Sequence, residues 1–343
     1  MNSKTYWEAR EKQKLKEQLK DVKKLENELK SVFSKASKDI EKEIFSLFTK
    51  YAEDNNLNYA QASQLLTSQE FKQWRYDLKG YIDLIEQTDD EQLLLELNTL
   101  AMKSRISRLE EMLYQVNKHI DESFKTFENG LGDLLEGSVS DSYYKTIYDI
   151  HKLTGVGTTF AFVNKEMIEE ILSYPWSGLN YSERIWKNRE KLKSTIKEEI
   201  TQMVIQGKGS REVSKSVAEK MNTSLSNASR LVHTEHSYVM SEASARSMKE
   251  TGVEKYEILA TLDQRTSDIC QRMDGEVFYL KDRTVGVNCS PFHWHPRCRT
   301  TEIPVVDLDL KESYRFARDK EGKAIKVPQS MTYKEWKKEF GID

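Results

Sequence analysis

The chain of 343 residues is poor in proline and cysteine. All five prolines lie at or after Pro175, so glycine is the only helix breaker in the first half. The three cysteines are an odd number, and charge rather than an apolar region follows Met1. We therefore expect no signal peptide, and folding in a cytoplasm, where disulfides are disfavoured. Long apolar runs are also missing, which argues against a membrane-spanning helix.

An excess of one charge is lacking too, because the formal net charge is only -3. Whole-molecule electrostatics therefore give no case for nucleic-acid binding. Locally, Tyr81–Asn98 carries six carboxylates and no Lys or Arg, whereas Arg184–Lys197 is basic. Such runs are usually solvated helix faces. The alternative is sequence-neutral contact with DNA phosphates, for which the candidates are Lys187, Arg189, Lys191 and Lys193.

Charged residues are abundant, at 32%, as is typical of long amphipathic helices. From Leu15 to Tyr51 an apolar residue recurs every three or four positions, which predicts one long helix or a coiled-coil-like arm. A second stripe from Leu93 to Ile120 predicts another helix, with Asp89 as its N-cap. Ordinary packing in a helix bundle is the simplest interpretation of both stripes.

Glycines between Gly130 and Gly157 loosen this pattern and indicate a domain boundary. Beyond them, Thr158–Asn164 is predicted to be a short strand or extended segment. Three helices and then three short strands follow, so the predicted fold is mainly α with a small α+β C-terminal module. The expected division is a long-helix region at 1–135, a linker with short elements at 136–173, the module at 174–306 and a basic tail at 307–343.

The densest group of chemically versatile side chains lies between residues 263 and 299. Zinc prefers sulfur and nitrogen ligands in a tetrahedron, and Cys270, His295 and Cys298 supply three of them. The candidates for a fourth ligand are His293, Cys289 and Asp263. The pattern predicts a structural zinc site. A disulfide formed after release, or buried polar residues that only brace the loops, are the alternatives. In each case pairing is expected between two arginines and two carboxylates: Arg265 and Arg299, with Asp263 and Asp274.

Other motifs do not support catalysis. The two histidines of His233-Thr-Glu235-His236 are three residues apart, not four as in a helical zinc-protease motif. We expect Glu235 to pair with Arg230 or Arg246 in helix packing. Because no nucleophile triad or phosphate loop is present either, the chain is predicted not to be an enzyme. The alternative is a metal-dependent hydrolase or transferase site built from Asp263, Arg265, His295 and Cys298.

Taken in order, these segments resemble the phage head morphogenesis family, the minor capsid proteins similar to the F protein of phage Mu. The resemblance runs from about Tyr174 to the end of the chain. One departure is Thr300, because the family motif usually ends Cys-Arg-Cys. The residues that carry the resemblance include Arg230, Glu235, Asp263, Arg265, Cys270, Asp274, Gly275, His295, Pro296, Cys298, Arg299, Tyr333 and Trp336.

The resemblance implies a low-copy structural protein of a tailed bacteriophage, made in the host cytoplasm and packaged in the capsid interior near the portal. It implies a role in head assembly, in genome ejection or in both. Expected partners are the portal protein, and the scaffold or major capsid protein; no membrane is expected. A non-specific DNA-binding ejection factor is an alternative. Some relatives carry toxin or transferase domains after this module, and we expect none here because the chain stops at Asp343.

Overall fold

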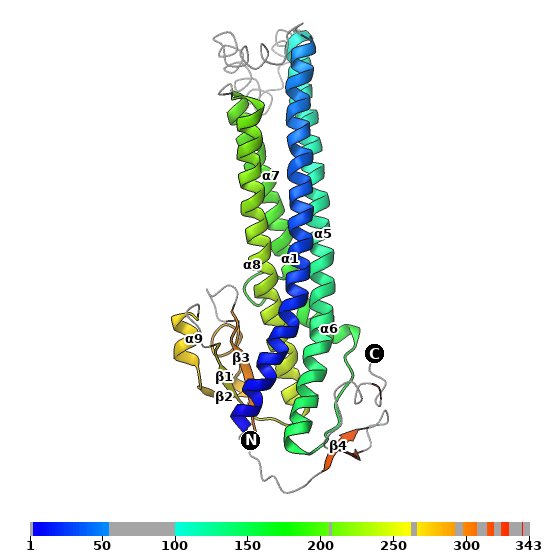
Figure 1. Ribbon diagram of the computed structural model, residues 1–343, viewed down its shortest axis with the longest axis vertical. Helices are drawn as coiled ribbons and strands as arrows, with labels where there is room; N and C mark the ends of the chain where they lie inside the picture. The colour runs from blue at the N-terminus through cyan, green and yellow to red at the C-terminus, as the bar shows by residue number, and fades with distance from the viewer. Residues whose placement is uncertain are drawn as a thin grey trace, which may run out of the picture. The chain divides into compact units, whose positions relative to one another are not determined.

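The computed structural model describes residues 3–54, 100–205, 208–261, 266–291, 298–306, 314–318, 324–328 and 338 (Figure 1). Helices dominate this part of the chain, and a small sheet follows them, which confirms the predicted fold class. The helices are α1 (Ser3–Asp54), α5 (Leu100–Thr154), α6 (Lys165–Ser173), α7 (Tyr181–Ile205), α8 (Ser210–Glu250), α9 (Asp268–Met273) and the short 3-10 helix η1 (Leu280–Asp282). The strands are β1 (Lys255–Leu259), β2 (Val277–Tyr279), β3 (Thr301–Val305), β4 (Tyr314–Arg318) and β5 (Ala324–Pro328).

The chain divides into two compact units, and α1, α5 and α8 each contribute residues to both. The first unit comprises Met1–Glu26, Asn129–Glu183 and Ser229–Asp343, and the second comprises Asn27–Glu128 and Arg184–Ala228. The boundary expected at residue 136 falls inside α5, which continues through the glycines to Thr154. Isolated glycines lower helix stability by only about 1 kcal/mol each, so helix packing overrides them.

The second unit is a helix bundle with an apolar interior. Segments of α1, α5, α7 and α8 lie side by side (Figure 1), and the rings of Phe33 and Phe124 approach to 5.6 Å between α1 and α5. Most of the predicted stripe is buried here, which confirms one long helix packed against a second. Full burial of such a side chain contributes about 1.5–3 kcal/mol. The buried members of the two stripes in this unit are Leu29, Phe33, Ala36, Ile40, Ile44, Leu109, Val116 and Ile120.

In the first unit the buried side of α1 differs from the predicted stripe. Leu19 is 37% exposed and Leu15 is only half-buried, so both lie beside the buried seam and not in it. Before Val22, a member of the predicted stripe that is buried, the buried positions are instead Trp7, Glu11, Lys14 and Gln18, which repeat with the same three-and-four spacing. Trp7 decides between the two stripes, because its indole packs in the core against the sheet and fixes the rotation of the helix.

The sheet of the first unit has the order β2-β1-β3, with both pairs antiparallel. Tyr256 lies opposite Phe278 and Pro304, and its side chain is fully buried. Tyr256 and Ile258 pack with Trp7 and with residues of α5, α8 and α9, so the sheet and four helices share one core. The three strands expected between residues 255 and 306 are thereby confirmed. A separate two-stranded antiparallel sheet joins β4 and β5.

The segment expected as a strand or extended segment at Thr158–Asn164 is extended but pairs with no strand among the described residues. Side chains of α5 and α8 satisfy part of its backbone. The Tyr143 hydroxyl donates to the Ala161 carbonyl at 2.8 Å, and the Val163 amide donates to the Tyr144 hydroxyl at 3.0 Å. Among the described helices, none has the length and hydropathy that crossing a membrane requires.

Candidate functional site

The predicted cluster of chemically versatile residues lies in the first unit, and part of it is described. The residues of the cluster outside the described ranges are Asp263, Arg265, His293, His295 and Pro296. Cys270, Asp274, Gly275, Cys298 and Arg299 are within the described ranges, around α9 and the start of β3. The ion pairs predicted for Asp263 and for Arg265 within this cluster therefore stay predictions.

Cys270 and Cys298 are brought together although 28 residues separate them, with their sulfur atoms 3.8 Å apart. Ser267 caps α9, its hydroxyl accepting from the Cys270 amide at 3.3 Å, and so fixes where that thiol points. The Ser290 hydroxyl lies 3.6 Å from the Cys298 sulfur. All three cysteines are buried free thiols, so the disulfide alternative is not the state seen here. The hydrogen bond with Cys298 and then burial raise the pKa of Cys270.

The spacing of these two sulfurs fits a tetrahedral metal. Two zinc–sulfur bonds of about 2.3 Å at the tetrahedral angle separate the sulfurs by about 3.8 Å. Within the described ranges, no group of three or more His, Cys, Asp or Glu side chains is placed to hold a metal. Cys270 and Cys298 therefore lie close together, whereas His293 and His295 lie outside the described residues, so the zinc site stays a prediction.

Asp274 and Gly275 form the turn from α9 into β2. The Asp274 carboxylate accepts from the Ala260 amide at 2.7 Å, and the Gly275 amide donates to the Ile258 carbonyl at 2.8 Å. Gly275 has a φ of 81°, a conformation that glycine adopts without a steric penalty. These two motif residues therefore hold the turn against β1.

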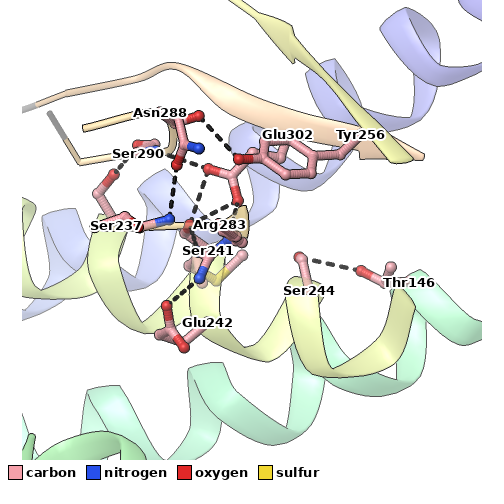
Figure 2. Close-up of polar contacts among 12 residues, drawn as sticks. Thr146, Ser237, Ser241, Glu242, Ser244, Tyr256, Arg283, Asn288, Ser290 and Glu302 are labelled. Carbon is pink, nitrogen blue, oxygen red and sulfur yellow. Dashed lines mark hydrogen bonds and ion pairs between the residues drawn. The ribbon is translucent and has the colours of Figure 1, made fainter. Parts of the chain in front are cut away.

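A buried charge network that the sequence did not reveal lies between α8 and the sheet (Figure 2). Arg283 donates to the Glu302 carboxylate at 3.1 Å and is also ion-paired with Glu242. Glu302 also accepts from the Ser241 hydroxyl at 2.9 Å and from the Ser290 amide at 2.8 Å. The Arg283 guanidinium, drawn between the two carboxylates in Figure 2, donates to the Ser241 hydroxyl as well.

The electrostatics of this network are those of a closed site. Burial raises the pKa of Glu302, and the neighbouring Arg283 opposes that shift. Burial would lower the pKa of Arg283, but Glu302 and Glu242 together raise it above its ordinary value. Because hydrogen bonds already occupy both Glu302 oxygens, this carboxylate is suited to bracing the sheet against α8 and not to general acid–base catalysis.

The histidine-containing turn of α8 also serves packing. Glu235 is buried and accepts from the Trp176 indole nitrogen at 3.1 Å, and the Trp176 ring stacks on Tyr238. The expected partner Arg246 instead pairs with Glu170 at 2.9 Å. Arg230 is exposed on the same helix. The contacts of Glu235 are therefore those of a packing residue, which agrees with the absence of zinc-protease spacing between His233 and His236.

The basic candidates for DNA contact lie in the second unit, on α7. Arg189 and Lys193 both pair with Asp121 of α5, at 3.1 and 2.7 Å, and Arg189 lies 4.2 Å above the Trp186 ring. Lys187 and Lys191 are exposed. Half of the predicted basic set is therefore engaged in holding α7 to α5, which weakens the case for a DNA-binding face.

Comparison with known proteins matches residues 194–301 to the family described as Phage Mu protein F like protein. Over these residues the chain is similar to the Phage Mu F-like family. The match extends from within α7 through α8 to the first residue of β3, and it includes Cys270, Arg283 and Cys298. The predicted resemblance is thereby confirmed.

Two curated proteins extend the comparison beyond the Phage Mu F-like segment. Minor head protein GP7 of Bacillus phage SPP1 is 24% identical over 327 residues, and the match covers 92% of each chain. The NAD(+)--arginine ADP-ribosyltransferase EFV of Enterococcus faecalis is 23% identical over 254 residues, which covers 69% of this chain but only 50% of that protein. No solved structure matches the chain significantly.

Proposed function

We propose that the chain is a minor head protein of a tailed bacteriophage, carried in the capsid interior. The observation that carries this proposal is the similarity to a protein named as a minor head protein over 92% of both chains. That match includes the long N-terminal helices as well as the Phage Mu F-like segment. A fragment shared by unrelated proteins would not extend so evenly over both.

The proposal places the chain near the portal, where it supports head assembly, genome ejection or both. The portal protein is the proposed partner, with the scaffold or the major capsid protein as further partners. The helical bundle of the second unit gives a long surface for such contacts, and its exposed side chains are mostly charged. Assembly in the host cytoplasm belongs to the same proposal.

A structural role is favoured over an enzymatic one by the state of the buried polar groups. Enzymes need an acid, base or nucleophile with a free position in a cleft, whereas Glu302 and Arg283 are saturated by each other and by Ser241. The transferase named among the similar proteins has half of its length outside the match. Its name therefore gives this chain no activity.

We further propose that Cys270 and Cys298 belong to a structural zinc site completed by histidine. The support is the 3.8 Å separation of their sulfurs. A bound metal would supply no chemistry to a substrate there; it would cross-link α9 to the segment that leads into β3.

An amber stop in the gene, tested with and without a suppressor, separates the proposed roles. If the chain serves assembly, suppressor-free infections yield fewer DNA-filled heads. If it serves ejection, they yield filled heads that adsorb but deliver their DNA poorly. Normal yield, content and infectivity of heads made without the chain would contradict the proposal.

A further inference from the structure

A groove in the first unit is bordered by α1, α8 and the start of β3. Leu15 and Leu19, the two leucines that stand outside the buried seam of α1, line it together with Met240 of α8. It holds a cavity of about 60 Å³ that water can enter, which is room for several water molecules. We call it the α1–α8 groove.

Two residues that line the α1–α8 groove each have a buried side-chain nitrogen without a partner among the described residues. The two atoms are the side-chain nitrogen Nε2 of Gln18 and the ring nitrogen Nε2 of His236. Gln18 is 7% and His236 is 8% exposed. A buried donor that stays unpaired costs about 1–3 kcal/mol. The amide nitrogen of Gln18 therefore favours an occupant that brings a hydrogen-bond acceptor.

Three exposed lysines of α1 lie beside the leucines of the groove. Lys12, Lys16 and Lys23 are exposed, and each stands three or four residues from Leu15 or Leu19, so they share one side of the helix with these leucines. None of the three forms an ion pair within the described ranges. The carboxylates that line the groove, Glu11 and Glu302, are already paired with Lys14 and Arg283.

We propose that the α1–α8 groove binds an acidic, aliphatic-containing segment of another protein of the phage head, an inference that rests on the proposed function. An aliphatic side chain of the segment lies between Leu15, Leu19 and Met240 and displaces the water there. Its backbone carbonyls or carboxylates accept from Gln18, and its acidic side chains face the three lysines. DNA fits less well, because its phosphates gain nothing from the exposed leucines.

A photo-cross-linker placed in the groove identifies the occupant. The full-length protein with Leu19→p-benzoylphenylalanine is supplied during infection, heads are irradiated, and cross-linked peptides are sequenced by mass spectrometry. The same cross-linker at Tyr114, exposed in the second unit, serves as the control position. We expect position 19, but not position 114, to join an acidic segment of one other head protein.

Charge reversal then tests the three lysines. The triple variant Lys12→Glu, Lys16→Glu and Lys23→Glu should lower the yield of that cross-link by about tenfold. The matched control reverses three exposed lysines elsewhere on α1, Lys30, Lys35 and Lys38, and should change the yield less than about twofold.

Three results would overturn the inference while leaving the proposed function intact, provided that the chain is found in virions. They are a cross-link from position 19 to DNA, a cross-link only to this chain itself, including its acidic residues 81–98, and a yield that both triple variants lower equally. Absence of the chain from virions would overturn the proposed function, and the inference with it.

Discussion

Arg283 and Glu302 form an ion pair of 3.1 Å in which the side chains are 8% and 1% exposed. The pair joins the loop before Cys289 to β3, and Ser241 ties both residues to α8. A buried pair that loses one member leaves an uncompensated charge in the core, which typically costs about 3–5 kcal/mol.

Arg283→Met should therefore lower the free energy of unfolding by about 3–5 kcal/mol, measured by denaturant titration of the full chain. The matched control is Arg246→Met, because Arg246 pairs with an exposed glutamate, Glu170, and its loss should cost less than about 1 kcal/mol. Adding Glu302→Gln to the Arg283 variant should recover part of the loss. Equal effects of the two arginine variants would show that the buried network does not brace the sheet.

Leu29 and Leu19 belong to the same predicted stripe but occupy different environments, at 1% and 37% exposure. Leu29→Asp places a carboxylate in the bundle core and should cost at least about 3 kcal/mol. Leu19→Asp should cost less than about 1 kcal/mol because water still reaches the side chain. Circular dichroism during thermal unfolding measures both. Similar losses would mean that α1 is rotated differently in solution.

The stability of the first unit should depend measurably on pH because of Asp149. Burial raises its pKa to about 6, and Arg10, at 2.7 Å, and Lys14 oppose that shift. Since the folded state binds this proton more tightly than the unfolded state, the stabilising contribution is full below about pH 4 and is lost as pH rises through about 6. A pKa raised from 3.8 to about 6 corresponds to about 3 kcal/mol of stability.

The comparison that isolates this effect is wild type against Asp149→Asn, with melting temperatures recorded from pH 4 to pH 7. The difference in melting temperature between the two proteins should change across this range, because the wild type loses stability relative to the variant as pH rises. His236, whose pKa burial lowers to about 4, gives the opposite slope in both proteins and cancels in the difference. A constant difference would show that Asp149 titrates normally.

The proposed zinc site predicts that the metal content and the melting temperature of the protein depend on Cys298. Protein purified with zinc present should hold about one metal per chain by elemental analysis, and Cys298→Ser should lose it and melt at a lower temperature. Cys289→Ser is the control, because Cys289 is equally buried but lies outside the close pair of sulfurs. Metal-free wild-type protein would leave Cys270 and Cys298 as ordinary buried thiols.

The sequence predicted the long helices well, because a three-and-four apolar repeat needs no knowledge of the partner. It did not predict how α1 is rotated near its start. Two stripes, one through Leu15 and Leu19 and one through Glu11, Lys14 and Gln18, both have helical spacing. Apolar content favoured the first, whereas the anchoring of Trp7 in the sheet core buries the second.

Only the cysteine part of the site could be predicted from the sequence. Cys270 and Cys298 stood out because zinc ligands have characteristic residue types, but Arg283, Glu242 and Glu302 look like ordinary surface charges in the sequence. Their pairing depends on which strand packs against α8. One signal was present: Ser237, Ser241 and Ser244 repeat at helical spacing on α8, which indicates a polar helix face directed at a polar partner.

The central claim is that this chain is a minor component of a phage head, and protein quantification in purified particles tests it most directly. Tail-free heads are isolated and digested, and this chain is measured by mass spectrometry against the portal and major capsid proteins. We expect a copy number near that of the portal and far below that of the major capsid protein. Absence of the chain from heads, or abundance equal to the major capsid protein, would contradict it.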